Sequence, residues 1–115
     1  MGKEFRRLPL EAFMHNTRSS NRFAGFYVYC LTLDGSIVYI GCSKVLCSRF
    51  WQHIERMQKD PIWEWNGIGV IQFATWDEAK VEEKRLIQLL DPPLNTTYAS
   101  KGSEADQILE LLGLK

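Results

Sequence analysis

The sequence lacks any apolar run close to the roughly 20 residues that a membrane-spanning helix requires. Its first residues, MGKEFRRLPL, also lack the apolar core of a secretory signal peptide, so we expect a cytoplasmic protein with no membrane partner. Cysteine is scarce: Cys30, Cys42 and Cys47 are the only three, and an odd number without an export signal favours reduced thiols. The spacing of Cys42, Cys47 and His53 is not that of a zinc finger, which disfavours a structural zinc site.

Net charge is missing as well, because 14 Lys and Arg residues balance 14 Asp and Glu residues. This balance disfavours the strongly basic class of nucleic-acid-binding protein. It conceals an asymmetry, since residues 1–60 carry nine basic and five acidic residues whereas residues 61–115 carry five and nine. A dipolar chain can present a locally basic face, although an accidental split explains the same counts.

The length of 115 residues is typical of one globular domain. We expect an N-terminal extension over residues 1–22, in which Pro9 opens a short helix and residues 16–22 form a polar linker. A C-terminal helical extension is expected over residues 99–115, with a helix capped at Ser103. This helix is a candidate dimer contact, and packing on its own domain is the alternative.

Three strands are expected in the central part of the chain. Aromatic and β-branched residues fill residues 26–33 and 37–40, on either side of Asp34-Gly35, a pair typical of hairpin turns. Residues 67–75 predict a third strand. A strict two-residue turn at Asp34-Gly35 would place Tyr27 and Tyr39 on opposite faces of the hairpin. We therefore expect a bulge or a three-residue loop, which puts both phenols on one face.

Two helices are expected to flank these strands. The first runs from a cap at Ser43 to about Lys59, with an apolar stripe at spacings of four, four and three residues. The second is capped at Thr75 and stops before Pro92. The order of hairpin, helix, strand and helix predicts an α+β fold, with a small three-stranded antiparallel sheet flanked by helices.

Several charged residues occupy unusual positions on these helices. Glu83 shares the apolar face of the second helix, where a lone carboxylate is costly unless it is paired or binds a metal. Arg49, His53 and Arg56 lie along one margin of the apolar stripe of the first helix. On these residues alone, a semi-buried ion pair between Arg49 and Glu83 is the simpler interpretation.

The triplets Gly25-Phe26-Tyr27 and Tyr39-Ile40-Gly41 resemble the defining signature of the GIY-YIG nuclease superfamily. The resemblance covers residues 25–97 and continues through five further positions in compatible order: Arg49, His53, Glu83, Pro92 and Asn95. Lys44 matches a basic position of the family. Phe26 replaces a small aliphatic residue, and Cys42 stands where the repair branch often has lysine.

The resemblance implies a GIY-YIG nuclease domain over residues 23–98 that acts as a metal-dependent DNA endonuclease. The catalytic side chains that it implies are Tyr27, Tyr39, Arg49, His53 and Glu83. It further implies DNA contacts from Lys44, Arg56 and Asn95, and one magnesium or manganese ion per site, held by Glu83. Arg49 would stabilise the phosphate, and the general base stays open among Tyr27, Tyr39 and His53.

Two other functions remain open at this point. One is a catalytically silent domain of the same fold that binds DNA or a protein partner. The other is a protein-interaction module with a contact patch of Trp51, Trp63 and Trp65. For the nuclease, we expect DNA as the partner, and the terminal extensions, a homodimer or a second protein as the source of specificity. Its small size suggests a phage or mobile-element origin, in bacterial or phage-infected host cytosol.

Overall fold

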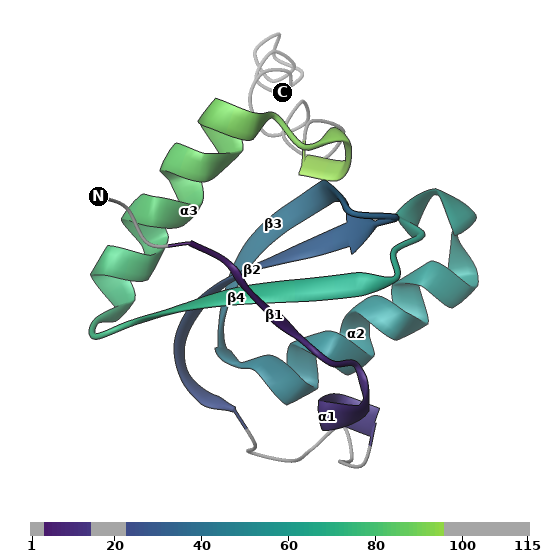
Figure 1. The fold of residues 1–115 in the computed structure, drawn as a ribbon, viewed down its shortest axis with the longest axis horizontal. Coiled ribbons are helices and arrows are strands. Elements are labelled where there is room, and N and C mark those ends of the chain that lie inside the picture. The colour runs from purple at the N-terminus through teal and green to yellow at the C-terminus, as the bar shows by residue number, and fades with distance from the viewer. Residues whose placement is uncertain (1–3, 15–22, 96–115) are drawn as a thin grey trace, which may run out of the picture.

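The computed structural model describes residues 4–14 and 23–95, and its centre is an antiparallel sheet (Figure 1). Strands β2 (Ala24–Leu33) and β3 (Ser36–Val45) form a hairpin, and β4 (Gly67–Phe73) pairs with the other side of β2. The expected α+β architecture is therefore confirmed. The expected C-terminal helix at Ser103 and the linker over residues 16–22 lie outside the described residues.

The sheet has four strands, so the expected count of three is wrong. Strand β1 (Arg6–Leu8) pairs antiparallel with β4 and gives the order β1-β4-β2-β3. Its three residues show no alternating pattern, and the free edge of β4 supplies their hydrogen-bonding partners. The short helix α1 (Glu11–Met14) follows, where a helix after Pro9 was expected.

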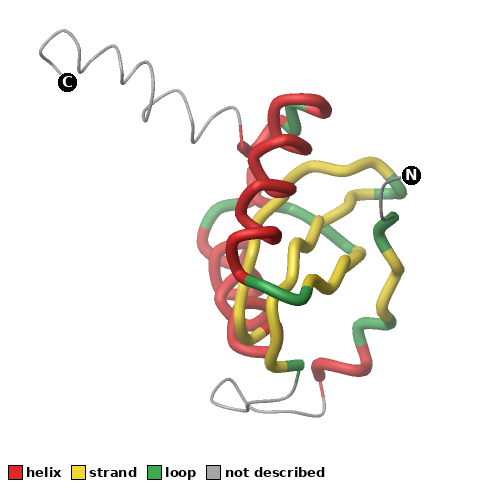
Figure 2. Tube along the Cα trace, turned by 90° about the vertical axis from the view of Figure 1, so that its left-hand side faces the viewer, coloured by secondary structure: helices red, strands yellow, loops and turns green. Residues whose placement is uncertain are grey.

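Two long helices cover opposite faces of this sheet. Helix α2 (Leu46–Lys59) contributes Leu46 and Phe50 to a cluster with Tyr29, whereas α3 (Trp76–Leu90) packs with the alternate residues of β2. In Figure 2, α3 lies in front of the strands and α2 behind them. The short 3-10 helix η1 (Pro61–Trp63) lies in the connection between α2 and β4. No helix within the described ranges has both the length and the apolar character needed to cross a membrane.

The β2–β3 hairpin contains the expected bulge. Asp34 and Gly35 form a two-residue turn with φ values of 52° and 88°, so the tight turn is kept. The register then shifts, because Thr32 pairs with Ile37 but Leu31 pairs with Tyr39. The extra residue between these pairs restores Tyr39 to the face that carries Tyr29.

The ends of the helices agree only in part with the expectations. Thr75 caps α3 by accepting a hydrogen bond from the Glu78 amide at 3.1 Å, as expected. The expected cap at Ser43 is wrong, because β3 continues to Val45. The Ser43 hydroxyl is buried and instead bonds the backbone of Val45, two residues further on.

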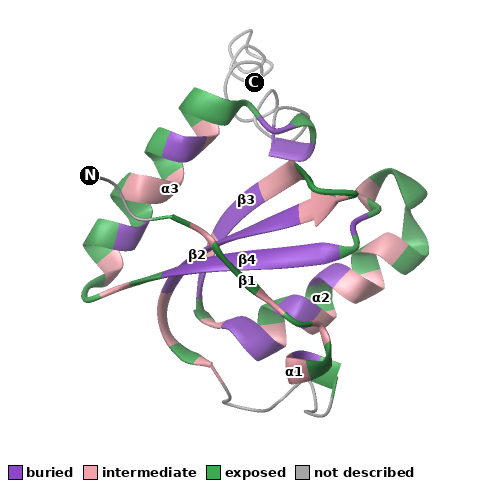
Figure 3. Cartoon of the chain, in the orientation of Figure 1, coloured by how far each residue is buried: buried purple, intermediate pink, exposed green. Residues whose placement is uncertain are grey.

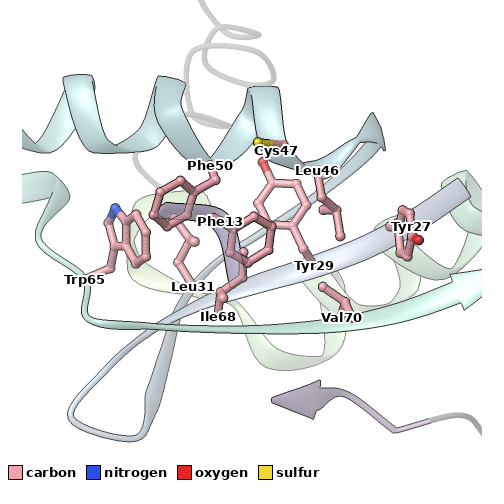
Figure 4. Close-up of a cluster of buried hydrophobic side chains, with 10 residues drawn as sticks. All are labelled: Phe13, Tyr27, Tyr29, Leu31, Leu46, Cys47, Phe50, Trp65, Ile68 and Val70. Carbon is pink, nitrogen blue, oxygen red and sulfur yellow. The ribbon is translucent and has the colours of Figure 1, made fainter. Parts of the chain in front are cut away.

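The hydrophobic core has one cluster on each face of the sheet. Figure 4 shows the larger cluster, in which side chains of β2 and β4 meet α2. Phe13 of α1 is fully buried there, stacked on Phe50 at a ring-centroid distance of 4.8 Å. Figure 3 shows the buried residues concentrated on the strands and on the inner sides of the helices. Trp65 is also in this core, which leaves Trp51, Trp63 and Trp65 without a common exposed patch.

Candidate active site

A cluster of two phenols and one imidazole lies where β2, β3 and α2 meet. The Tyr29 hydroxyl lies 2.7 Å from Nε2 of the buried His53. The Tyr39 ring completes the cluster, with its centroid 6.1 Å from that of Tyr29 and 5.2 Å from that of His53. All three side chains come from positions fixed by the sheet and one helix, so their mutual placement is set by the fold.

The placement of Tyr29 depends on a glycine in the neighbouring strand. Tyr29 pairs directly with Gly41 across the hairpin. A Cβ atom built on Gly41 would lie 2.6 Å from the Tyr29 hydroxyl oxygen, a distance that real Cβ atoms essentially never show. Only glycine at position 41 leaves room for the Tyr29 phenol to pack over β3 and reach His53. The last residue of the Tyr39-Ile40-Gly41 triplet therefore has a steric role.

The protonation states of this cluster follow from burial and from two arginines. Burial, followed by the charges of Arg49 and Arg56, lowers the pKa of His53 from 6.5 to about 4. The imidazole is therefore neutral near pH 7. Burial is also the main cause that raises the pKa of Tyr29 well above its ordinary value. The Tyr29 hydroxyl therefore keeps its proton and forms a hydrogen bond with Nε2 of His53, in a direction set by the tautomer of the ring.

The open edge of β3 carries a cleft of about 610 Å³ between α2 and α3. Tyr29 and Tyr39 line it from the hairpin, Arg49 from α2, and Glu83 from α3. Lys44 and Lys80 also line it, each with its ammonium group over the Trp76 ring, at 4.9 and 5.7 Å. Four of the expected site residues therefore line one opening: Tyr39, Lys44, Arg49 and Glu83. A fifth, His53, is connected to it by the hydrogen bond with Tyr29.

Glu83 reaches this cleft around the edge of the sheet, from the face opposite α2. Its Oε1 atom accepts a hydrogen bond from the Cys42 thiol at 2.9 Å and lies 3.5 Å from the Lys80 ammonium. Burial and the neighbouring Glu83 carboxylate raise the pKa of Cys42 from 9.0 to about 12, so the thiol stays protonated as the donor. The cationic partner of Glu83 is Lys80, and the ion pair considered with Arg49 does not form.

A second, smaller hollow of about 200 Å³ adjoins the cleft, with Tyr39, Arg49 and Gln52 common to both. His53 and Arg56 complete its lining, which contains no carboxylate. Within residues 4–14 and 23–95, neither Arg49 nor Arg56 forms an ion pair. Two guanidinium groups therefore face this hollow with no acidic side chain to balance them.

Two of the expected site residues lie elsewhere. Tyr27 is buried and lines neither hollow, and Figure 4 shows its ring set apart from that of Tyr29 along β2. Asn95 is buried behind β3, where its Oδ1 accepts from the Ile40 amide at 2.7 Å and its Nδ2 donates to the Ile40 carbonyl at 2.9 Å. Both polar groups of Asn95 are thus engaged with strand backbone.

Sequence reasoning missed three features of this site. Tyr29 is not among the site residues expected from the sequence; its signal is the register, which sets it opposite Gly41. Cys42 enters the sequence analysis only as a disfavoured zinc ligand and as a departure from the family pattern, and its contact with Glu83 spans 41 residues of sequence. The stacking of Trp63 on Arg56 has no local sequence signal.

Comparisons with known proteins agree with this geometry at the level of the fold. No family model matches the chain, and no curated protein matches it in sequence. Among solved structures, it is similar to the GIY-YIG N-terminal endonuclease domain of UvrC from Thermotoga maritima bound to its catalytic divalent cation, magnesium. That similarity has a TM-score of 0.54 and 22% identity, over 72% of this chain and 94% of that domain.

A point mutant of the same Thermotoga maritima domain, also bound to its catalytic divalent cation, matches equally well. Its TM-score is 0.54, with 21% identity over 72% of this chain and 93% of the mutant domain. The structural likeness and the signature triplets on the β2–β3 hairpin lead to the same result. The chain has the fold of a GIY-YIG endonuclease domain.

Proposed function

We propose that this chain is a metal-dependent endonuclease that hydrolyses phosphodiester bonds in DNA at the cleft beside β3. The observation that carries the proposal is the convergence of Tyr29, Tyr39, Arg49 and Glu83 on one opening, from four different elements. Metal-assisted phosphodiester hydrolysis needs a held cation, a positioned water and stabilisation of the phosphate charge, which the carboxylate, the two phenols and the guanidinium could respectively provide.

Glu83 would hold one magnesium or manganese ion. Among the described residues, no three His, Cys, Asp or Glu side chains come together as a metal cage. A single carboxylate at an open cleft suits magnesium, which keeps most of its water ligands and needs few from the protein. When bound, the ion would polarise the scissile phosphate and lower the pKa of coordinated water.

Arg49 would bind the scissile phosphate. It lies on the exposed rim shared by both hollows, and its planar guanidinium can donate two parallel hydrogen bonds to phosphate oxygens. Its charge is permanent, so it would remain available as negative charge grows in the transition state. Lys44, Lys80 and Arg56 would add weaker contacts to flanking DNA.

Tyr39 and the Tyr29–His53 pair would position the attacking water. The neutral imidazole of His53 holds the Tyr29 phenol in one orientation and can accept its proton. Burial and the charge of Glu83 raise the pKa of Tyr39. Neutralising Glu83 removes the second of these causes, which couples proton transfer at Tyr39 to cation binding. We therefore assign to Tyr29 the position first expected for Tyr27.

The test is an incubation of the purified protein with supercoiled plasmid in magnesium, manganese or EDTA. We expect nicking with either cation and none with EDTA or with Glu83→Gln, which keeps the shape of the side chain but removes its charge. Glu82→Gln is the matched control on the same helix, because Glu82 pairs with Arg85 and lies outside the cleft.

Two results of this assay bear on the alternatives. Equal nicking by the wild type and Glu83→Gln would overturn the site, and absence of nicking would leave the silent DNA- or protein-binding domain. The ratio of nicked to linear product reports whether one copy cuts one strand or a homodimer cuts both. A partner protein that confers specificity would add sequence preference to the mapped cuts.

A further inference from the structure

The smaller hollow beside the cleft is built around an arginine that is held in place by a tryptophan. The Arg56 guanidinium carbon lies 4.3 Å from the centroid of the Trp63 ring, in a cation–π contact. The Trp63 ring in turn meets Tyr39 edge-on, with centroids 5.6 Å apart. Arg56 is exposed on α2, yet this contact restricts its guanidinium to the side facing Tyr39.

The segment that carries Trp63 is itself fixed. Asp60 caps η1 by accepting a hydrogen bond from the Ile62 amide at 3.2 Å, and Pro61 begins the helical turn. Backbone hydrogen bonds from Trp63 to Asp60 and from Glu64 to Pro61 close the turn, at 3.0 and 3.1 Å. The tryptophan is therefore a fixed support for Arg56.

The chemistry of the hollow favours an anion with several oxygen atoms. Arg49 and Arg56 both line it without a carboxylate beside them, and the other two ionisable groups, His53 and Tyr39, are neutral near pH 7. Because Arg56 covers one face of Trp63, that face is closed to a stacked nucleobase. A phosphate group fits this set of donors better than a base does.

We propose that this hollow binds the phosphate adjacent to the scissile one in the same DNA strand, with Arg56 as its principal cation and Trp63 as the residue that positions Arg56. The inference rests on the proposed function, because the shared Arg49 links the hollow to the cleft where the scissile phosphate binds. It also specifies the substrate class: a strand that continues past the cut, as in endonucleolytic cleavage.

The first test measures DNA binding in EDTA, so that it does not depend on cleavage. A fluorescent 20-base-pair duplex is titrated with the wild type, Arg56→Ala, Trp63→Leu and the double variant. Lys59→Ala is the control, since Lys59 is an exposed cation on the same helix that lines neither hollow. For Arg56→Ala we expect about tenfold weaker binding and a salt dependence reduced by about one released counterion.

The energetic coupling between Arg56 and Trp63 distinguishes a specific phosphate site from a general attraction between DNA and positive charge. Trp63→Leu should weaken binding about threefold and Lys59→Ala less than twofold, as for loss of one exposed contact. The double variant should bind no more weakly than Arg56→Ala, because Trp63 acts through Arg56. Additive losses, or an Arg56→Ala titration that matches Lys59→Ala, would overturn the inference.

The second test places the site next to the cut. Nick positions are mapped on a defined duplex, and each phosphate flanking a cut is then replaced by an uncharged methylphosphonate. One replacement should slow the wild type about tenfold but leave Arg56→Ala unaffected. Equal slowing of both proteins at every flanking position would contradict the assignment. If the plasmid assay detects no cleavage while the EDTA titrations behave as expected, the catalytic proposal and the adjacency to a cut fail, and the hollow is supported only as a DNA-phosphate site.

Discussion

The Tyr29 hydroxyl and Nε2 of His53 lie 2.7 Å apart, and this contact joins the central strand β2 to helix α2 beneath the cleft. With the imidazole neutral, one ring nitrogen carries a proton and the other accepts, so the direction of this hydrogen bond depends on the tautomer of His53. The pair fixes the orientation of both rings. It also gives Tyr29 a place in the site that Tyr27, two residues earlier on the same face, does not have.

Tyr29→Phe should lower the nicking rate about a hundredfold, in the range expected for loss of a proton-transfer or water-positioning group. Tyr27→Phe should stay within about threefold of the wild type, because Tyr27 lines neither hollow. Single-turnover nicking of plasmid compares the two directly. The reverse order of effects would return the site to the residue that the sequence triplet first indicated.

Arg49→Ala should slow cleavage about a hundred- to a thousandfold, the effect typical of removing one electrostatic stabiliser of a transition state. Arg49→Lys should recover only part of the rate, because an ammonium cannot bind phosphate with two parallel hydrogen bonds. Arg85→Ala is the control, being an exposed arginine paired with Glu82. Similar rates for Arg49→Ala and Arg85→Ala would exclude Arg49 from the chemistry.

Cys42→Val should raise the magnesium concentration needed for half-maximal cleavage about tenfold, as for loss of a residue that orients a metal ligand. The thiol donates to Oε1 of Glu83, and valine cannot. Cys42→Ser keeps a donor and should remain close to the wild type. If serine and valine shift the magnesium requirement equally, the thiol does not orient Glu83.

The free energy of unfolding should decrease as the pH is lowered, over a range set by the pKa of His53. Its pKa is lowered from 6.5 to about 4, so the unfolded chain binds this proton more tightly than the folded one does. The stability that depends on the neutral imidazole is complete above pH 6.5 and is lost as the pH falls toward 4. The loss should total about 3 kcal/mol, at the conversion of about 1.4 kcal/mol per pKa unit.

Urea unfolding between pH 4 and 7.5 measures this dependence for the wild type and for His53→Gln. Glutamine can still accept a hydrogen bond from Tyr29 but does not titrate. The variant should therefore show a flatter dependence of the free energy of unfolding on pH. Parallel curves would mean that other groups cause the acid sensitivity.

Asn95→Ala should destabilise the fold by about 2–4 kcal/mol, because it leaves the buried amide and carbonyl of Ile40 without partners. The control is Asn66→Ala, since the bonds of Asn66 to Asp34 are exposed and their loss should cost about 1 kcal/mol or less. Urea denaturation gives both values. A stable Asn95→Ala variant with weakened DNA binding would instead support the DNA contact expected from the sequence.

The elements that depend on local pattern were predictable. The apolar stripe of α2, the Thr75 cap of α3 and the stop before Pro92 all follow from residues within one or two helical turns. The bulge after Asp34-Gly35 was predictable for a different reason: a plain hairpin would have separated Tyr27 from Tyr39. Each of these features is determined by the chain close to it.

The rest depended on contacts between distant segments. Strand β1 exists because β4 has a free edge, which its own three residues do not reveal. Tyr27 and Tyr29 share a face and a chemistry, and only the pairing of Tyr29 with Gly41 distinguishes them. The role of Asn95 depends on a contact across 55 residues. In each case the deciding partner lies in another element.

The Asn95–Ile40 contact has a consequence for how copies of this protein can associate. An outer strand with unpaired backbone groups can template the addition of a strand from another molecule. At Ile40 the outward-facing amide and carbonyl of β3 are already capped by a side chain, so sheet extension is blocked at that point. Pairing of two β3 edges through this position would require Asn95 to be displaced, so we expect copies that act together on a duplex to associate through another surface.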